Sequence, residues 1–210
     1  MFPVRVWFSK TGPARFISHL DLMRYFTRAL RRAKLPIWLT EGFNPHPYIN
    51  FASPLSLGTE GLNECFDIKL TENLPVKIVA DELSPVMTGG IKIKSVTMPL
   101  HKTAKIAFAD YTLFFDADVK DSLTAFLNSD VIEIDKKGKL INVKSDIRSF
   151  SVSDSQFSIL NSQLNITLPC SPSQNVNPVL IATAFCGTHN VPAPLITRNR
   201  LLIENEEKFE

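Results

Sequence analysis

The fold of this chain is decided by residues 4–39, VRVWFSKTGPARFISHLDLMRYFTRALRRAKLPIWL. Val4–Ser9 is a short run of β-branched and aromatic residues, which predicts a strand, and a Gly-Pro pair ends it. Ser18–Lys34 carries apolar side chains at helical spacing, and its serine is followed three residues later by an acid, a variant of the capping box. Pro36–Leu39 begins another extended segment. This stretch therefore predicts a strand, a helix and a second extended segment.

The rest of the first half continues this pattern. Gly42–Pro54 is rich in proline, which predicts a constrained loop or an irregular strand. Asn63–Thr71 alternates as a strand does, Pro75–Met87 favours a helix with proline at its start, and Ile91–Val96 favours a strand. The resulting order, β-α-β-β-α-β, is that of the ferredoxin-like split motif.

The second half repeats this order of elements without repeating the residues. Its predicted strand, helix, two strands, helix and strand are Lys105–Phe115, Lys120–Asn128, Val131–Ile134, Phe157–Leu168, Asn177–Cys186 and Leu195–Ile203. Lys136–Lys139 is interpreted as a hairpin turn and Leu140–Asp154 as an inserted segment. The predicted fold is α+β, with two tandem ferredoxin-like subdomains and antiparallel sheets, at residues 1–99 and 100–210.

Charge is unevenly distributed along the chain. The net charge of +2 does not imply a polyanionic partner by itself, but residues 10–47 hold seven Lys and Arg against two acids. Arg198 and Arg200 share one face of the last predicted strand and could extend a basic surface. The tail Glu204–Glu210 is acidic and is expected to be frayed.

Composition indicates an ordinary globular protein, because 44% of the residues are hydrophobic and 21% are charged. The three cysteines lie far apart, without the spacing of a zinc or iron–sulfur site, so free thiols in a reducing compartment are expected. The N-terminus lacks the apolar run of a signal peptide, and no stretch is apolar enough to cross a bilayer. A cytoplasmic protein without a cofactor or metal is therefore predicted.

A helical wheel separates two faces of the predicted helix Ser18–Lys34. One face is apolar and would pack on a sheet: Leu22, Phe26, Ala29, Leu30 and Ala33. The opposite face would lie in solvent with four arginines: Arg24, Arg28, Arg31 and Arg32. Guanidinium groups form forked contacts with phosphate, and an array about 10 Å long matches two or three backbone phosphates. The same face could instead bind an acidic protein surface, or be a solvated helix face.

The loop Gly42–Pro47, GFNPHP, places Asn44 and His46 between prolines that restrict the backbone. Polar side chains held in this way suit a binding or catalytic loop, and His46 could also shuttle a proton near neutral pH. Phe43 and Tyr48 flank the pair and could stack on a base. The alternative is a turn in which both polar side chains cap nearby backbone groups.

His19 lies at the start of the predicted helix, toward its apolar side. A lone histidine in this position is more often a packed or capping residue than a catalyst. If the fold brings it beside His46, the two could form a general acid/base pair. The two histidines and Asp21 are also a weak candidate for a metal site.

Three motifs resemble one family. They are RFISHLDLMR at 15–24, RALRRAKL at 28–35 before Pro36, and GFNPHP at 42–47, followed by Ala52, Pro54-Leu55 and Gly58. Together they look like the radical SAM-linked protein family, also called DUF2344, and the match covers roughly residues 5–70. The chain departs from the family pattern at Tyr48, where a Lys or Arg is expected.

The resemblance implies a radical SAM enzyme as the partner, since family members occur beside such an enzyme or fused to its C-terminus. Genes for ribonuclease E/G and ribosomal proteins lie nearby in some lineages, which associates the family with modification of RNA or the ribosome. This chain has no cysteines spaced for an iron–sulfur cluster. It would therefore be the separate partner of the radical enzyme.

Three functions are compatible with the sequence. The first is an accessory module that delivers an RNA or ribosomal substrate to a radical SAM enzyme, bound through Arg15, Arg24, Arg28, Arg31, Arg32, Asn44 and His46. The second is a metal-independent endoribonuclease in which His19 and His46 serve as general base and acid. The third is a protein adaptor whose arginines dock on an acidic patch of the radical SAM enzyme.

Overall fold

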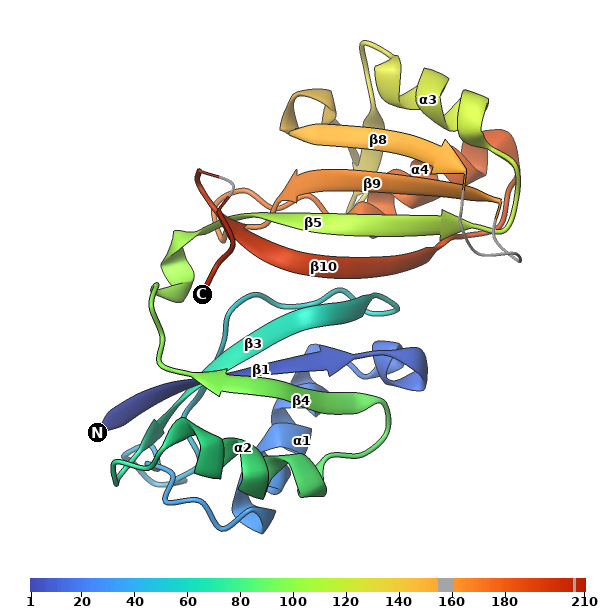
Figure 1. Ribbon diagram of the computed structural model, residues 1–210. Coiled ribbons are helices and arrows are strands. Elements are labelled where there is room, and N and C mark those ends of the chain that lie inside the picture. Colours follow the sequence, from blue (N-terminus) through green and yellow to red (C-terminus); the bar gives the residue numbers. More distant parts are fainter. Residues whose placement is uncertain (155–160, 206) are drawn as a thin grey trace. The chain divides into compact units, whose positions relative to one another are not determined.

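The computed structural model describes residues 1–154, 161–205 and 207–210. The chain forms two compact units, one of Met1–Ile106 with Lys208–Glu210 and one of Ala107–Glu207 (Figure 1). The predicted α+β class is confirmed, with a mostly antiparallel sheet and few helices. None of the helices in the described residues is long and apolar enough to span a membrane.

The first unit has a four-stranded antiparallel sheet. Its strands are β1 (Phe2–Lys10), β2 (Ile49–Phe51), β3 (Glu60–Leu70) and β4 (Ile91–Thr97), and its helices are α1 (His19–Arg32) and α2 (Val76–Leu83). The strand order is β4-β1-β3-β2, and both helices lie on one face of the sheet (Figure 1). Short 3-10 turns are η1 (Gly12–Phe16), η2 (Ser84–Val86) and η3 (Thr103–Lys105). The strands predicted at Val4–Ser9, Asn63–Thr71 and Ile91–Val96 and both predicted helices are confirmed, although α2 ends earlier than expected and η2 follows it. The predicted extended segment Pro36–Leu39 forms only isolated bridges, and β2 lies within the predicted loop or irregular strand Gly42–Pro54.

The core of the first unit lies between the sheet and α1. Phe8 of β1 packs edge-on against Phe26 of α1, with 4.9 Å between ring centroids, and Phe26 lies 4.4 Å from Phe66 of β3. Such aromatic pairs contribute about 0.5–1.5 kcal/mol each beyond the burial of their area. The apolar face of α1 is buried as predicted: Leu22, Phe26, Ala29, Leu30 and Ala33. The packing therefore fixes which face of α1 meets solvent.

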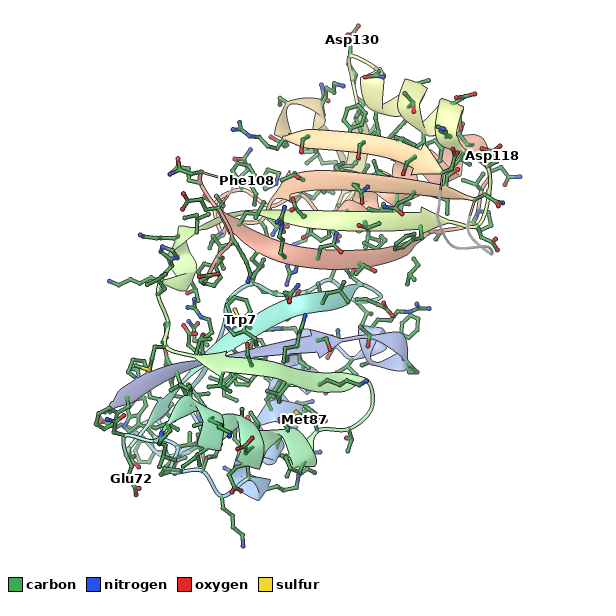
Figure 2. All side chains as sticks on the ribbon, in the orientation of Figure 1. Trp7, Glu72, Met87, Phe108, Asp118 and Asp130 are labelled. Carbon is green, nitrogen blue, oxygen red and sulfur yellow. The ribbon has the colours of Figure 1, made fainter. Side chains whose placement is uncertain are left out.

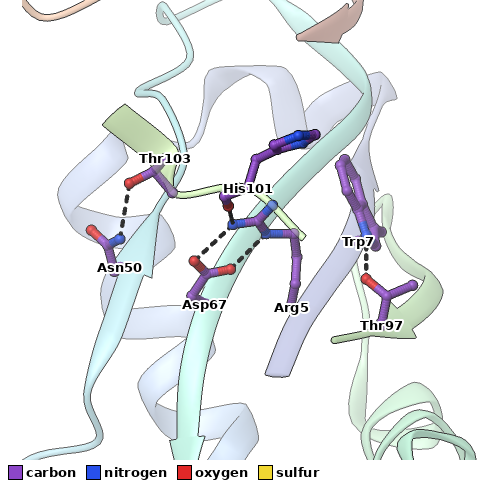
Figure 3. Close-up of polar contacts among 7 residues, drawn as sticks. All are labelled: Arg5, Trp7, Asn50, Asp67, Thr97, His101 and Thr103. Atoms are coloured by element: carbon purple, nitrogen blue, oxygen red, sulfur yellow. Dashed lines mark hydrogen bonds and ion pairs between the residues drawn. The ribbon is translucent and has the colours of Figure 1, made fainter. Parts of the chain in front are cut away.

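The opposite face of this sheet carries a buried ion pair (Figure 3). Arg5 follows Val4 in β1, and successive residues of a strand point to opposite faces, so Arg5 lies away from the helices. Its Nε donates to Asp67 Oδ1 at 2.7 Å, and its Nη2 donates to Asp67 Oδ2 at 2.9 Å. Nη2 also donates to the His101 carbonyl at 2.8 Å. Because Arg5 is fully buried, its charge depends on Asp67 for compensation.

The last residues of the chain pack on this same face. The Phe209 ring is fully buried, 4.2 Å from the Arg5 guanidinium and 6.3 Å between centroids from Trp7. The Glu210 carbonyl accepts a hydrogen bond from the His101 N–H at 2.9 Å. The expectation of a frayed tail is therefore wrong for Phe209, because its ring covers a buried cation and an indole.

The second unit also has a four-stranded sheet. Its strands are β5 (Ile106–Phe115), β8 (Ser149–Asp154), β9 (Ser162–Pro169) and β10 (Leu195–Ile203), and its helices are α3 (Lys120–Asn128) and α4 (Pro178–His189). The strand order is β10-β5-β9-β8. A separate hairpin consists of β6 (Glu133–Lys136) and β7 (Lys139–Asn142), and the turn η4 (Lys144–Asp146) follows it.

The predicted strand Val131–Ile134 overlaps β6 only at residues 133 and 134, and β6 does not join the larger sheet of this unit, because it pairs with β7 in a two-stranded sheet of its own. Lys137 and Gly138 have φ angles of 60° and 81°, the left-handed backbone of a tight hairpin turn. This turn folds β6 onto the residues that directly follow it. The predicted hairpin turn at Lys136–Lys139 is confirmed, and it explains why β6 is unavailable to the larger sheet.

The strand that takes this place comes from the segment predicted to be an insertion, Leu140–Asp154. Its last part is β8, which pairs with β9. Phe150 and Val152 are half-buried and alternate with exposed serines, the pattern of a strand with one covered face. The predicted strand Phe157–Leu168 is confirmed from residue 162 onward, and its residues 157–160 lie outside the described residues.

Candidate nucleic-acid interface

Helix α1 begins with a side-chain cap. Ser18 Oγ accepts a hydrogen bond from the Asp21 N–H at 3.2 Å and donates one to Asp21 Oδ2 at 2.8 Å. The cap satisfies one of the N–H groups that a helix leaves free at its start. Asp21 Oδ1 accepts from Arg24 Nη1 at 2.9 Å. The Ser18 hydroxyl and the Arg24 guanidinium lower the pKa of Asp21, so this exposed carboxylate is ionised at neutral pH and pairs with Arg24.

Four exposed arginines follow the solvent side of α1, and we call them the Arg face: Arg24, Arg28, Arg31 and Arg32. Arg24 pairs with Asp21, and Arg32 Nη2 donates to the Val86 carbonyl at 3.1 Å. Arg28 and Arg31 have no hydrogen bond or ion pair with any residue that the structure describes. Their donors are therefore available to an anion from outside the chain.

The solvent side of α1 becomes apolar near its N-terminus. We call this group of exposed side chains the apolar end: Phe16, Leu20, Met23 and Leu57. The Gly58 N–H donates to the Arg15 carbonyl at 2.9 Å, which holds the segment after β2 beside η1. The Arg15 guanidinium lies 4.8 Å from the Phe16 ring centroid, so Arg15 belongs to this end and not to the Arg face. The apolar end was not predicted, although Leu20 and Met23 fall outside the buried arc of the helical wheel.

The GFNPHP loop, Gly42–Pro47, is organised around His46. The Thr40 N–H donates to the His46 carbonyl at 2.8 Å, and the His46 N–H donates to Thr40 Oγ1 at 3.3 Å. His46 Nδ1 lies 3.0 Å from the Asn44 carbonyl oxygen. Since a carbonyl oxygen only accepts, the proton belongs on Nδ1, and Nε2 of the neutral ring is left as an acceptor. The Asn44 carbonyl thus favours the tautomer of His46 that carries its proton on Nδ1.

Two aromatic rings and a lysine hold the base of this loop. The Tyr48 N–H donates to the Trp38 carbonyl at 3.2 Å, and the two rings lie 5.8 Å apart. Lys69 Nζ lies 5.0 Å from the Trp38 centroid and 4.6 Å from the Tyr48 centroid, within range of a cation–π interaction. Beyond this base, Phe43 is fully exposed and Asn44 is exposed. The loop therefore presents an aromatic ring and an amide to solvent from a fixed base.

His19 packs against β2. Its ring lies edge-on to Phe51, with 5.1 Å between centroids. Burial, and then the charge of Lys10, lowers the pKa of His19, which favours a neutral ring. No hydrogen bond or ring contact joins His19 to His46. Within the described parts of the chain, no group of three or more His, Cys, Asp or Glu could hold a metal.

The residues of this site lie within a longer stretch that matches a known family. A family model described as "Uncharacterized protein conserved in bacteria (DUF2344)" matches residues 4–178. The chain belongs to the DUF2344 family. No curated protein matches it. Among solved structures, "Crystal Structure of an Unknown Protein from Galdieria sulphuraria" is similar, with 10% identity, a TM-score of 0.28, and coverage of 94% of this chain and 96% of that chain.

In this DUF2344 chain, the two arginines of the last strand differ in their exposure. Arg198 is fully buried, with Nη1 3.6 Å from Cys170 Sγ. Its neighbour Thr197 is buried too, so both faces of β10 are covered at this point. Arg200 is exposed, but its Nε donates to Asp110 Oδ2 at 2.6 Å. The prediction is wrong for Arg198 because strand alternation says which residues share a face, not whether that face is covered.

The DUF2344 chain is expected to lose stability as the pH falls from about 7 to 5, in part through His19. Its pKa in the folded state lies below the ordinary 6.5, so between these two values the unfolded chain binds more protons. The stabilisation that neutral His19 gives to the folded chain is fully present above pH 6.5, and it is lost as the pH falls through the lowered pKa of His19. Urea unfolding at pH 7.5, 6.5 and 5.5 should show a weaker pH dependence for His19→Phe than for the wild type. An unchanged dependence, or the same change in the exposed control His46→Gln, would contradict this assignment.

Proposed function

We propose that this chain is an accessory protein of a radical SAM enzyme and binds an RNA or ribosomal substrate through the Arg face and the GFNPHP loop. The observation that carries the proposal is the pair Arg28 and Arg31, which are exposed and have no partner among the described residues. Two neighbouring guanidinium groups that make no ion-pair contact with a carboxylate repel one another, and an external phosphate relieves that repulsion. Forked contacts make arginine well suited to this task.

An unpaired stretch of RNA suits this site better than a duplex. The major groove of an A-form helix is too narrow for side chains to read, so specific recognition of RNA favours unstacked bases. The fully exposed ring of Phe43 could stack on such a base, an interaction that contributes about 1–3 kcal/mol. His46 Nε2, as an acceptor, could receive a hydrogen bond from a ribose 2′-hydroxyl, which DNA lacks.

The proposed link to a radical SAM enzyme comes from the family resemblance of the motifs between residues 15 and 58. We also propose that each unit is a ferredoxin-like repeat. In support, the strand orders β4-β1-β3-β2 and β10-β5-β9-β8 each place the first strand of the unit between its last strand and its third. In this scheme β6 and β7 are the insertion in the second repeat.

Binding of single-stranded RNA is expected to weaken steeply with salt. For single strands, the logarithm of the binding constant falls with the logarithm of salt by about 0.7 per phosphate neutralised. About three phosphates on the Arg face give a slope near −2, and so roughly a 16-fold loss between 50 and 200 mM salt. Fluorescence anisotropy of a labelled oligonucleotide measures this slope. Absence of binding at 50 mM salt would contradict the proposal, and shortened RNA after incubation would favour an endoribonuclease instead.

The apolar end favours a second candidate, a protein adaptor. Exposed aliphatic side chains such as Leu20 and Met23 offer no stacking surface to a base, but they suit the apolar centre of a protein interface. In this alternative the radical SAM enzyme would dock on the apolar end. Co-purification that is lost in Leu20→Glu and retained in Arg28→Glu would separate this function from RNA binding.

A further inference from the structure

The second unit has a polar groove on the sheet face opposite α4. Phe115 of β5 packs on Phe185 of α4, with 5.7 Å between centroids, so the alternate residues of β5 face the other way. That other face is hollowed into a groove of about 530 Å³. Figure 1 shows the four strands side by side with α4 behind them, and Figure 2 shows side chains standing on the near face. The polar side chains that carry the argument are Asp110, Ser149, Ser151, Asn165, Thr167 and Arg200.

One row of hydrogen bonds crosses all four strands of this sheet. Ser149 Oγ donates to Thr167 Oγ1 at 3.1 Å, and Thr167 Oγ1 donates to Asp110 Oδ1 at 2.7 Å. From the other side, Arg200 Nε donates to Asp110 Oδ2 at 2.6 Å. Both carboxylate oxygens of Asp110 therefore accept hydrogen bonds from within the protein. The charge of that carboxylate is balanced by Arg200.

A second row lies beside the first. Asn165 Oδ1 accepts hydrogen bonds from Thr112 Oγ1 at 2.9 Å and from Gln163 Nε2 at 3.1 Å. Asn199 Nδ2 donates to Thr112 Oγ1 at 2.8 Å. These bonds fix the orientation of the Asn165 amide, because its oxygen occupies the side where the donors lie. Its Nδ2 group is consequently presented as a donor.

Several hydrogen-bond donors in the groove have no partner among the described residues. Arg200 uses only its Nε, so its two Nη groups have no partner among the described residues. The Asn165 Nδ2 group and the exposed hydroxyl of Ser151 are likewise without a partner there. The strong acceptors, Asp110 and Asn165 Oδ1, are already engaged. A ligand that completes this groove must bring acceptors, and a phosphate offers several to the two Arg200 Nη groups at once.

The geometry points to a binding site for a phosphate ester of the nucleotide type in this groove. The Arg200 Nη groups would grip the phosphate in a fork, with the Asn165 amide and the Ser151 hydroxyl as further donors. The groove is larger than a phosphate needs and has serine and threonine hydroxyls, which can both donate to and accept from a sugar. The phosphate could come from a free nucleotide or from an RNA strand. This inference does not depend on RNA binding at the Arg face.

The experiment is a titration of the ¹⁵N-labelled full chain with uridine 5′-monophosphate, inorganic phosphate and uridine, followed by backbone amide shifts. The monophosphate is expected to shift Ser151, Asn165 and Arg200, and uridine is expected to leave them unchanged. Arg200→Gln should weaken the binding of the monophosphate at least about tenfold, because the variant loses a charge-assisted fork. Ser151→Val should weaken the binding of the monophosphate a few-fold. The control Ser153→Val, two residues along the same strand and outside the groove, should leave that binding unchanged.

An eight-nucleotide oligouridylate identifies the source of the phosphate. Shifts at the groove that persist with this RNA in the Arg28→Glu/Arg31→Glu variant would assign the site to RNA, and shifts with the mononucleotide alone would assign it to a free nucleotide. No groove shift with millimolar monophosphate would overturn the inference, as would equal affinity in wild type, Arg200→Gln and Ser151→Val. Failure of RNA binding at the Arg face would leave the mononucleotide result unaffected, so the two proposals fail separately.

Discussion

Arg28→Glu/Arg31→Glu is expected to weaken the binding of single-stranded RNA at least about 30-fold at 50 mM salt. The estimate assigns about 1 kcal/mol to each lost guanidinium–phosphate contact, and the introduced carboxylates add repulsion. Both side chains are exposed and lie opposite the buried arc of α1, so the substitutions should leave the fold intact. Anisotropy of a labelled oligonucleotide, with circular dichroism as a check of folding, measures the effect.

The matched control is Lys136→Glu/Lys139→Glu. These exposed lysines face each other across the β6–β7 hairpin, and their replacement changes the net charge by the same amount. It also exchanges one like-charged pair for another, so the stability of the hairpin should change little. Affinity close to that of the wild type is expected for this control. Equal losses in both double variants would mean that only the total charge matters, and the Arg face would have no special role.

Asp67→Ala is expected to destabilise the chain by about 3 kcal/mol. The substitution removes both carboxylate oxygens from Arg5, which is fully buried in the first unit. A buried charge that loses its partner typically costs about 3–5 kcal/mol, and partial exposure of Asp67 argues for the lower end of this range. The bond from Arg5 to the His101 carbonyl remains but supplies no compensating charge. Urea unfolding at neutral pH measures the loss.

Two further variants distinguish charge from packing. Asp81→Ala removes an exposed carboxylate of α2 that has no ion pair among the described residues, and it should change stability by less than about 0.5 kcal/mol. Arg5→Met/Asp67→Leu removes both charges and should recover much of the loss, because an apolar pair of similar size often replaces a buried ion pair at little cost. A loss below about 1 kcal/mol for Asp67→Ala would show that water reaches Arg5.

Local patterns were sufficient to predict α1 and its two faces. The buried arc and the four exposed arginines follow from a 3.6-residue period, and the Ser18 cap follows from the residue types at the helix start. The family was recognisable for a similar reason, since its motifs are contiguous runs of residues in this part of the chain. Features that depend on neighbours within one element were therefore accessible from the sequence.

Features that depend on distant residues were missed. Arg5 and Asp67 are 62 positions apart, and Phe209 meets them from the other end of the chain. The alternation of Val4, Arg5 and Val6 is typical of a strand with one face in solvent, so the pattern did not indicate that Arg5 is buried. The sequence does not say what covers the second face. For the same reason the acidic residues around Phe209 suggested a frayed tail.

The prediction placed the strand after α3 at Val131–Ile134, whereas β8 is the strand that pairs with β9 in the second unit. This error has a different cause. Both segments have strand-like alternation, and a short strand does not specify its partner. The outcome depends on the turn at Lys137 and Gly138, whose left-handed backbone favours immediate pairing with β7. Within the site, the side chains were predicted but their engagement was not: only tertiary contacts distinguish Arg32, bonded to a carbonyl of η2, from Arg28 and Arg31.

The most direct test of RNA binding by this chain is photo-crosslinking with a single-stranded RNA that carries 4-thiouridine, followed by mass spectrometry of the crosslinked peptides. A base stacked on the fully exposed Phe43 is expected to crosslink within the GFNPHP loop, and the crosslink should disappear in Arg28→Glu/Arg31→Glu. Lys136→Glu/Lys139→Glu should retain it. Crosslinks that avoid residues 15–48, or that are indifferent to Arg28 and Arg31, would contradict the proposal that the Arg face and this loop form the RNA-binding site.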